Sequence, residues 1–167
     1  MRILILGGDG YLGWSTALHL SASGYDVVIV DNFWKRNTLR ELNRPDLFQV
    51  EPIETRIDVW RTHSGKSIDL QVGDVCDQSF LSSVVREFVP DAIVHYAEQP
   101  SAPYSMLGYT EAEYTLRNNL LSTLSLVYAV RDEAPETHII KLGTMGEYGT
   151  PNIPIEEGFL EIEHKGR

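Results

Sequence analysis

A glycine-rich segment near the N-terminus has the residue types and spacing that a phosphate-binding turn requires. Gly7, Gly10 and Gly13 form a G-x-x-G-x-x-G pattern between an apolar run at residues 3–6 and a helical pattern. The first glycine permits a tight turn, the second lets the backbone approach a pyrophosphate, and the third allows close packing of helix on strand. The N-terminus of the helix then stabilises phosphate charge. We therefore predict a dinucleotide site and assign to it Gly7, Asp9, Gly10, Tyr11, Leu12 and Gly13.

An acidic residue at the end of the next apolar run supports the same chemistry. Asp31 lies 18 residues beyond Gly13, and a carboxylate there accepts hydrogen bonds from both adenosine ribose hydroxyls and repels a 2′-phosphate. NAD is therefore favoured over NADP. Arg36 weakens this inference, because a nearby arginine can accommodate the phosphate; it and Asn32 are included among the cofactor-binding candidates. The alternative is a set of turn glycines and a strand-end aspartate without a ligand.

Two further pairs of residues are candidates for the cofactor site. Asp74 and Val75 follow an apolar run at residues 68–72, where a residue can contact the adenine ring or act as a turn or N-cap residue. Asn118 and Asn119 fall in the middle of a long helical pattern, where asparagine is locally unfavourable. They either serve the site or capture a neighbouring loop carbonyl, and Asn119 is retained as a cofactor-binding candidate.

The candidates for substrate chemistry follow the later strands. In open α/β sheets, ligands bind at the carboxyl ends of the strands. A hydroxyl after the apolar run 139–142 can hydrogen-bond a substrate oxygen, and a nearby carboxylate can exchange a proton, although a glycine-rich turn without a ligand is the alternative. His95 is expected to be a buried strand-end residue rather than a catalyst. The substrate-binding candidates are Glu98, Gln99, Ser101 and Thr144, and the catalytic candidates are Thr144, Met145 and Glu147.

Strands and helices alternate along the chain, which predicts the elements that position these residues. The apolar runs are short and continuous, as in strands buried on both faces. The pattern predicts an α/β fold with a doubly wound parallel sheet, the Rossmann architecture. One face of the longest helix carries Leu116, Leu120, Leu124, Val127 and Arg131. The predicted strands are residues 3–6, 27–30, 68–72, 92–95 and 139–142, and the predicted helices are residues 11–23, 80–88 and 111–132.

The domain organisation has two unusual features. Between Asp31 and Ile68 lie 36 residues, far more than such a connection needs, so we expect an ordered insertion at about residues 32–67 with one or two helices. We expect a nucleotide-binding domain over residues 1–149 and the incomplete start of a substrate-domain segment at 150–167. No sixth strand is visible, so the fold is expected to stop before its last strand. The insertion contains a basic cluster of Lys35, Arg36, Arg40 and Arg44. Such a cluster is usually the solvent-exposed face of a helix, and less commonly it contacts a phosphate.

Composition excludes several other classes of protein. The 24 acidic and 14 basic residues give a formal net charge of −10, which disfavours binding to nucleic acid or to an anionic membrane surface. Cys76 is the single cysteine, so no internal disulfide can form, and no Cys/His cluster has zinc spacing. No apolar run reaches membrane length, and the first residues do not have the pattern expected of a signal peptide. We expect a cytoplasmic protein without a metal or membrane insertion.

Several segments show a resemblance to a known family. The longest are residues 141–153 and 155–158. The shorter ones are residues 62–69, residues 101–106, residues 118–119 and the glycine-rich turn. With these segments the chain resembles the UDP-sulfoquinovose synthase family of extended short-chain dehydrogenases/reductases over essentially its whole length. The two longest segments are specific to that family rather than general to the superfamily, and the family shares the long insertion.

The resemblance implies a reaction and roles for particular residues. It implies that tightly held NAD oxidises UDP-glucose at C4, that water is lost across C5 and C6, that sulfite adds at C6, and that the hydride returns. The product donates the head group of sulfolipid. Thr144 corresponds to the catalytic threonine on the C4 oxygen, and Met145 and Glu147 would flank C6 and the sulfite. A homodimer is expected for the full-length protein.

Two departures from the family pattern limit these expectations. The family's general base is a Tyr-x-x-x-Lys pair beyond the segment where this chain ends, and no such pair occurs in it, so we expect weak or no NAD binding and no turnover from the isolated chain. Pro100 stands where the family usually has arginine, a natural ligand of sulfite or phosphate. The alternatives are therefore a UDP-sugar 4-epimerase or dehydratase of the same superfamily, and a non-catalytic dinucleotide-binding module.

Overall fold

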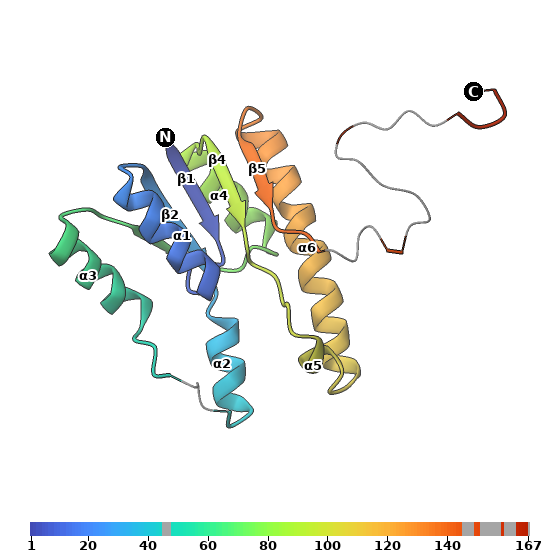
Figure 1. Ribbon diagram of the computed structural model, residues 1–167, viewed down its shortest axis with the longest axis horizontal. Coiled ribbons are helices and arrows are strands. Elements are labelled where there is room, and N and C mark those ends of the chain that lie inside the picture. The colour runs from blue at the N-terminus through green and yellow to red at the C-terminus, as the bar shows by residue number, and fades with distance from the viewer. Residues whose placement is uncertain (45–47, 145–148, 151–157, 159–162, 167) are drawn as a thin grey trace.

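A five-stranded parallel sheet forms the centre of the computed structural model, which describes residues 1–44, 48–144, 149–150, 158 and 163–166 (Figure 1). The strand order is β3-β2-β1-β4-β5, so the order reverses between β1 and β4. All four neighbouring pairs are parallel. This confirms the predicted doubly wound sheet. Its strands are β1 (Arg2–Leu6), β2 (Asp26–Asp31), β3 (Asp69–Val72), β4 (Ala92–His95) and β5 (His138–Lys141).

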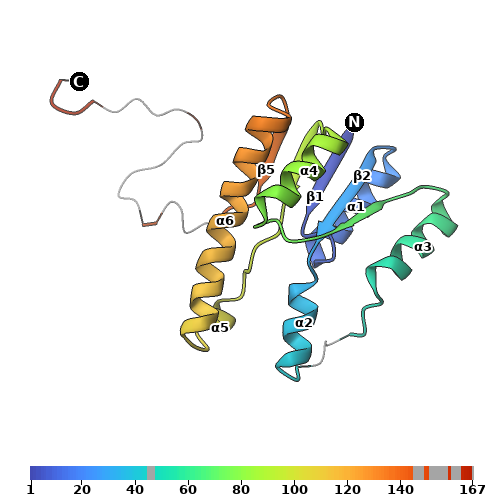
Figure 2. The ribbon, with the colours of Figure 1, turned by 180° about the vertical axis from the view of Figure 1, so that it is seen from behind.

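Helices cover both faces of the sheet. On one face, α1 (Tyr11–Ala22) and α3 (Ile53–Ser64) pack on Ile3, Ile5 and Ile29. Figure 2 shows the opposite face, where α4 (Gln78–Phe88) and α6 (Tyr109–Glu133) lie against the strands. Successive strand residues point to opposite faces, so Leu4 and Leu6 belong to the second core. Each such fully buried side chain stabilises the fold by about 1.5–3 kcal/mol.

The helix boundaries follow local capping chemistry. The apolar pattern predicted a helix from residue 80, but α4 begins at Gln78, because the Asp77 side chain accepts hydrogen bonds from the backbone of Ser79 at 2.9 Å and Phe80 at 3.2 Å. The predicted insertion contains two helices, α2 (Trp34–Glu41) and α3. A short helix that the sequence did not predict, α5 (Ala102–Ser105), follows β4. Figure 1 places α2 and α5 beyond the carboxyl ends of the strands.

The long helix α6 packs on the sheet with a face that mixes polar, small and branched apolar residues. Ser122, Leu126 and Ala129 are buried. The apolar stripe noted in the sequence lies on another face of α6, where Leu116, Leu120, Leu124 and Val127 are between 49% and 69% exposed. Among the described residues, no helix is long and apolar enough to cross a membrane.

Candidate dinucleotide-binding site

The turn after β1 has a geometry that requires glycine at Gly7, Gly8 and Gly13. Gly7 has a φ of 88°, and its N–H, like that of Gly8, donates to the Val30 carbonyl at the end of β2. A Cβ on Gly13 would lie 2.0 Å from the Gly7 carbonyl oxygen. Gly10 is the N-cap of α1 and has no side chain to occupy the amides of the first turn. The turn therefore brings bare backbone to the start of α1, as the sequence predicted.

A cavity of about 400 Å³ opens at this turn. It lies where the strand order reverses, between the carboxyl ends of β1 and β4, which is where open α/β sheets bind ligands. Its volume falls in the range of small-molecule sites. Ten of the residues that the sequence assigned to cofactor or substrate line it: Gly7, Asp9, Gly10, Tyr11, Asp31, Asn32, Arg36, Val75, Glu98 and Gln99.

Asp31 is held in place by backbone donors at the end of β2. Its Oδ2 accepts from the Asp9 N–H at 2.8 Å, and its Oδ1 accepts from the Phe33 N–H at 2.8 Å. Burial raises the pKa of Asp31, an effect that these hydrogen bonds partly offset. A carboxylate has about four lone-pair sites, so Asp31 retains acceptor capacity beyond the two backbone bonds. The residue thus fits the predicted role of a ribose ligand.

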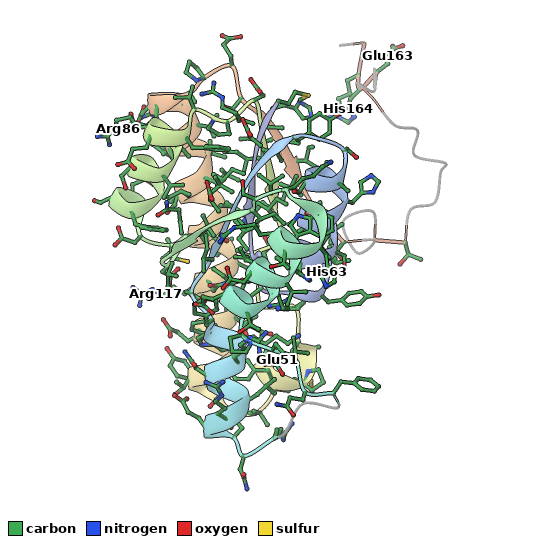
Figure 3. All side chains as sticks on the ribbon, turned by 90° about the vertical axis from the view of Figure 1, so that its left-hand side faces the viewer. Glu51, His63, Arg86, Arg117, Glu163 and His164 are labelled. Carbon is green, nitrogen blue, oxygen red and sulfur yellow. The ribbon has the colours of Figure 1, made fainter. Side chains whose placement is uncertain are left out.

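Asp9 is paired with two arginines from the insertion. Nη2 of Arg36 donates to its Oδ1 at 2.9 Å, Nε of Arg36 contacts its Oδ2, and Nη2 of Arg56 contacts its Oδ1. Both arginines also donate to the carbonyl oxygen of Glu51, at 3.3 Å and 3.1 Å; Figure 3 shows Glu51 in the segment between α2 and α3. The Arg56 guanidinium lies over the Trp14 ring, 4.8 Å from its centroid.

Arg56 lines the cavity but was not among the predicted site residues. Burial lowers the pKa of Arg56, and the charges of Asp9 and Asp31 partly offset that effect. No local pattern in the sequence links Arg56 to the glycine turn, because its partner lies 47 residues earlier. Only the packing of α3 on the sheet brings the two together.

The cofactor candidates Asp74, Val75 and Asn119 separate into one cavity residue and two structural ones. Val75 is buried and lines the cavity. Asp74 instead makes a turn: its Oδ1 accepts from the Cys76 N–H at 2.8 Å, and its Oδ2 accepts from Asn32 at 3.2 Å. Asn119 binds the loop after β4, accepting from the Gln99 N–H at 2.8 Å and donating to the Gln99 carbonyl at 3.1 Å. Its neighbour Asn118 lines the cavity.

Glu98 forms an ion pair that joins the ends of β4 and β5. Lys141 Nζ lies 2.7 Å from its Oε1, and His95 Nε2 lies 3.9 Å from the same atom. The His95 side chain is fully buried, as predicted, and burial lowers its pKa to about 4, so the ring is neutral at physiological pH. Lys141 was not predicted as a site residue. The pair fixes the backbone from which Gln99 and the following loop start.

The loop after β4 is ordered by its own side chains. Gln99 Nε2 donates to Thr115 Oγ1 at 2.7 Å, and Gln99 Oε1 accepts from the Ser101 N–H at 2.6 Å. Ser101 caps α5, because its Oγ accepts from the Tyr104 N–H at 3.2 Å. Gln99 therefore lines the cavity while its side chain holds the loop, and Ser101 has a capping role outside the cavity lining.

An aromatic cluster contributes two residues to the cavity lining. Trp34 of α2 stacks on Tyr114 of α6 with ring centroids 4.4 Å apart, and Tyr104 of α5 meets Trp34 edge-on at 5.0 Å. Trp34 and Tyr114 both line the cavity. Burial raises the pKa of the Tyr114 hydroxyl. Three helices from separate parts of the sequence meet here, so the cluster ties the insertion to the rest of the fold.

The remaining predicted residues lie elsewhere. Leu12 points outward and is 44% exposed, Gly13 packs beneath Gly7, and Thr144 is exposed beyond β5; none of the three lines the cavity. Met145 and Glu147 fall outside the described residues. Within the part of the chain that the structure describes, no group of three or more His, Cys, Asp or Glu side chains is placed to hold a metal ion.

The parallel sheet, the glycine turn and the strand-end carboxylate together define a Rossmann-type nucleotide-binding domain. The chain belongs to the NAD dependent epimerase/dehydratase family, which it matches over residues 3–165.

Two UDP-sulfoquinovose synthases are similar to this chain over nearly its whole length. The chain is 51% identical over 166 residues to a UDP-sulfoquinovose synthase of Spinacia oleracea, which is named as chloroplastic, covering 99% of this chain and 34% of that protein. It is 45% identical over 157 residues to the UDP-sulfoquinovose synthase of Sulfolobus acidocaldarius, covering 94% of this chain and 40% of that protein. The chain thus spans less than half the length of either.

Its fold is similar to that of a UDP-glucose 4-epimerase from Bifidobacterium longum, solved in complex with NAD+ and UDP. The TM-score is 0.70 at 26% sequence identity, over 94% of this chain and 41% of that one.

Proposed function

We propose that this chain binds NAD and forms the nucleotide-binding part of an enzyme that makes UDP-sulfoquinovose from UDP-glucose and sulfite. The observation that carries the cofactor assignment is Asp31, held at the end of β2 beside a turn where Gly7, Gly10 and Gly13 have no side chain to cover the backbone. The substrate assignment is supported by 51% identity to a protein of that name.

The residues present fit a dinucleotide. The turn at Gly7 and Gly10 and the N-terminus of α1 would hold the pyrophosphate, and Asp31 would accept from the ribose hydroxyls. Val75 would lie against the adenine, with Glu98 and Gln99 toward the nicotinamide and sugar. NAD, when bound, would supply a reversible hydride acceptor. The side chains of the chain orient it: the Asp9 pairs fix the turn, and the Gln99 bonds fix the loop opposite.

The sugar chemistry is assigned to the segment after β5. The Thr144 hydroxyl would donate a hydrogen bond to the C4 oxygen of the sugar, and Met145 and Glu147 would flank C6 and the sulfite. A tyrosine–lysine pair, which this sequence does not contain, would have to supply the general base. Loss of a general base alone costs about 10²–10⁴-fold in rate, so the isolated chain has no measurable turnover in this account.

Pro100 favours a second candidate, a UDP-sugar 4-epimerase or dehydratase. Proline has no group that can bind sulfite, and it stands where the resembled family has arginine. Incubating the native gene product with UDP-glucose, with and without sulfite, separates the two. A sulfonated UDP-sugar that forms only with sulfite supports the first proposal, whereas UDP-galactose or a 4-keto product in both samples supports the second.

Three wider assignments belong to the same proposal. The full protein acts as a homodimer, for which the exposed apolar stripe of α6 offers a surface. Its product feeds sulfolipid head-group synthesis. It works in the cytoplasm, where a single free cysteine such as Cys76 stays reduced; fractionation of the source cells tests this, because the spinach relative is named as chloroplastic.

A further inference from the structure

Four charged side chains share one end of the candidate cavity: Asp9, Asp31, Arg36 and Arg56. Asp31 is the expected ribose ligand, and the Asp9 backbone donates to it directly. The Asp9 carboxylate points into the arginine pair instead, and its side chain is only 8% exposed. The two arginines are 18% and 15% exposed, so all three groups are largely removed from water.

Two arginines beside a ribose-binding carboxylate would ordinarily form a phosphate-binding site. Guanidinium groups bind phosphate through paired N–H donors. Here, however, those donors are engaged within the chain. The Asp9 carboxylate accepts from Nε and Nη2 of Arg36 and from Nη2 of Arg56. Arg36 Nη1 donates to the Val50 carbonyl at 3.0 Å. Arg56 Nε donates to the Glu51 carbonyl at 3.1 Å.

We propose that Asp9 is a specificity-determining residue, whose carboxylate occupies Arg36 and Arg56 and so excludes the 2′-phosphate of NADP. This inference rests on the proposed NAD site. A 2′-phosphate beside Asp31 would have to displace Asp9 from both arginines and would then face two carboxylates in a poorly hydrated cavity, where like charges repel strongly. Asp9 therefore adds a second barrier to the one that Asp31 provides.

The proposal predicts an asymmetric response to loss of the Asp9 charge. Asp9→Asn keeps the size of the side chain and one acceptor oxygen but removes the carboxylate charge that directly contacts both arginines. We expect the affinity for NADP to rise by about tenfold, the value of one charged hydrogen bond of ordinary strength, and the affinity for NAD to change far less. Adding Arg56→Gln to Asp9→Asn should remove most of the gain.

The experiment is calorimetric titration of the native gene product with NAD, NADP, 5′-AMP and adenosine 2′,5′-bisphosphate. The two short probes confine the measurement to the adenosine end of the site. Asp58→Asn is the matched control, because it removes the same charge from an exposed pair on α3, 3.2 Å from Arg61. Asp9→Ser is a second variant that removes the charge with a smaller side chain, and circular dichroism shows that each variant is folded.

The outcomes are distinct. A higher ratio of 2′,5′-bisphosphate to 5′-AMP affinity in Asp9→Asn or Asp9→Ser, absent in Asp58→Asn, supports the assignment. NAD binding with an unchanged ratio in both Asp9 variants overturns it, as does an equal gain for both probes, which would mean that the arginines serve the 5′-phosphate. A folded wild-type protein that binds neither NAD nor 5′-AMP overturns the proposed function, and this inference with it.

Discussion

The backbone N–H of Asp9 donates to Asp31 Oδ2 at 2.8 Å, joining the glycine turn to the end of β2 across 22 residues. The parallel register of β1 and β2 brings the two together, because Leu6 pairs with Val30. One carboxylate thus fixes the turn and retains the capacity to bind a ribose. The shape of the turn and the choice of cofactor are therefore coupled through Asp31.

Gly13 is the position in the turn that should tolerate a side chain least. Gly13→Ala would place a Cβ 2.0 Å from the Gly7 carbonyl oxygen, so the backbone must move. We expect a loss of at least ~3 kcal/mol in the free energy of unfolding, together with loss of NAD binding. Urea denaturation measures the first and calorimetry the second.

Gly65→Ala is the matched control for that change. Gly65 has a φ of 70°, but a methyl group added there would meet no neighbouring atom within 4 Å, and the residue does not line the cavity. Left-handed backbone strain alone should cost roughly 1–2 kcal/mol there, with NAD affinity unchanged. Equal effects of the two substitutions on NAD binding would contradict the account of the turn.

Burial of His95 should make the stability of the fold depend on pH. Its pKa falls from 6.5 to about 4 on folding, so the unfolded chain binds the proton more readily. The contribution of neutral His95 to the free energy of unfolding is present above pH 6.5 and declines as the pH falls toward 4. Between pH 7.5 and 5.0 the loss from this residue is about 2 kcal/mol. Denaturation at both pH values should show that difference, and His95→Gln should reduce it. An unchanged pH dependence in the variant would contradict this assignment.

The Trp34–Tyr114 stack should hold the insertion against α6. Trp34→Leu removes the ring whose centroid lies 4.4 Å from that of Tyr114, and it removes an aromatic side chain from the cavity lining. We expect a loss of about 1–3 kcal/mol in stability and weaker NAD binding. Tyr114→Phe keeps the ring and loses only a 3.4 Å contact to Asn118, so it should be nearly neutral. If Tyr114→Phe is as damaging as Trp34→Leu, the hydroxyl rather than the stack is responsible.

The apolar stripe of α6 should mediate self-association. Leu120 lies at its centre and is 69% exposed. Leu120→Glu places a charge in the proposed interface and should convert a dimer of the native gene product to a monomer in light scattering. Glu113→Gln, an exposed change on the same helix, is the control. A native monomer, or a dimer that Leu120→Glu leaves intact, would exclude this surface.

The sequence predicted the sheet because its strands are short apolar runs, and in β1, β2 and β4 most of these residues are buried. The expectation of strands buried on both faces is wrong for the two edge strands, because most residues of β3 and β5 are exposed. It predicted the glycine turn and Asp31 because their spacing is set by one strand–helix–strand unit. It did not predict Arg56 or Lys141, whose partners, Asp9 and Glu98, are distant in the sequence. Nor did it settle Asp74 and Asn119, because an aspartate or asparagine near a site can bind either a ligand or the neighbouring backbone, and in the structure both bind within the chain.

NAD binding at Asp31 is the feature on which the proposed function most directly depends. The decisive measurement is calorimetric titration of the native gene product with NAD, after removal of any nucleotide that copurifies, for the wild type and for Asp31→Ala. Asp26→Ala, at the exposed opposite end of β2, is the control. We predict one NAD per chain, weakened at least about tenfold by Asp31→Ala through loss of a charged hydrogen-bond acceptor and unaffected by Asp26→Ala. Equal NAD affinity in the wild type and Asp31→Ala would contradict the account.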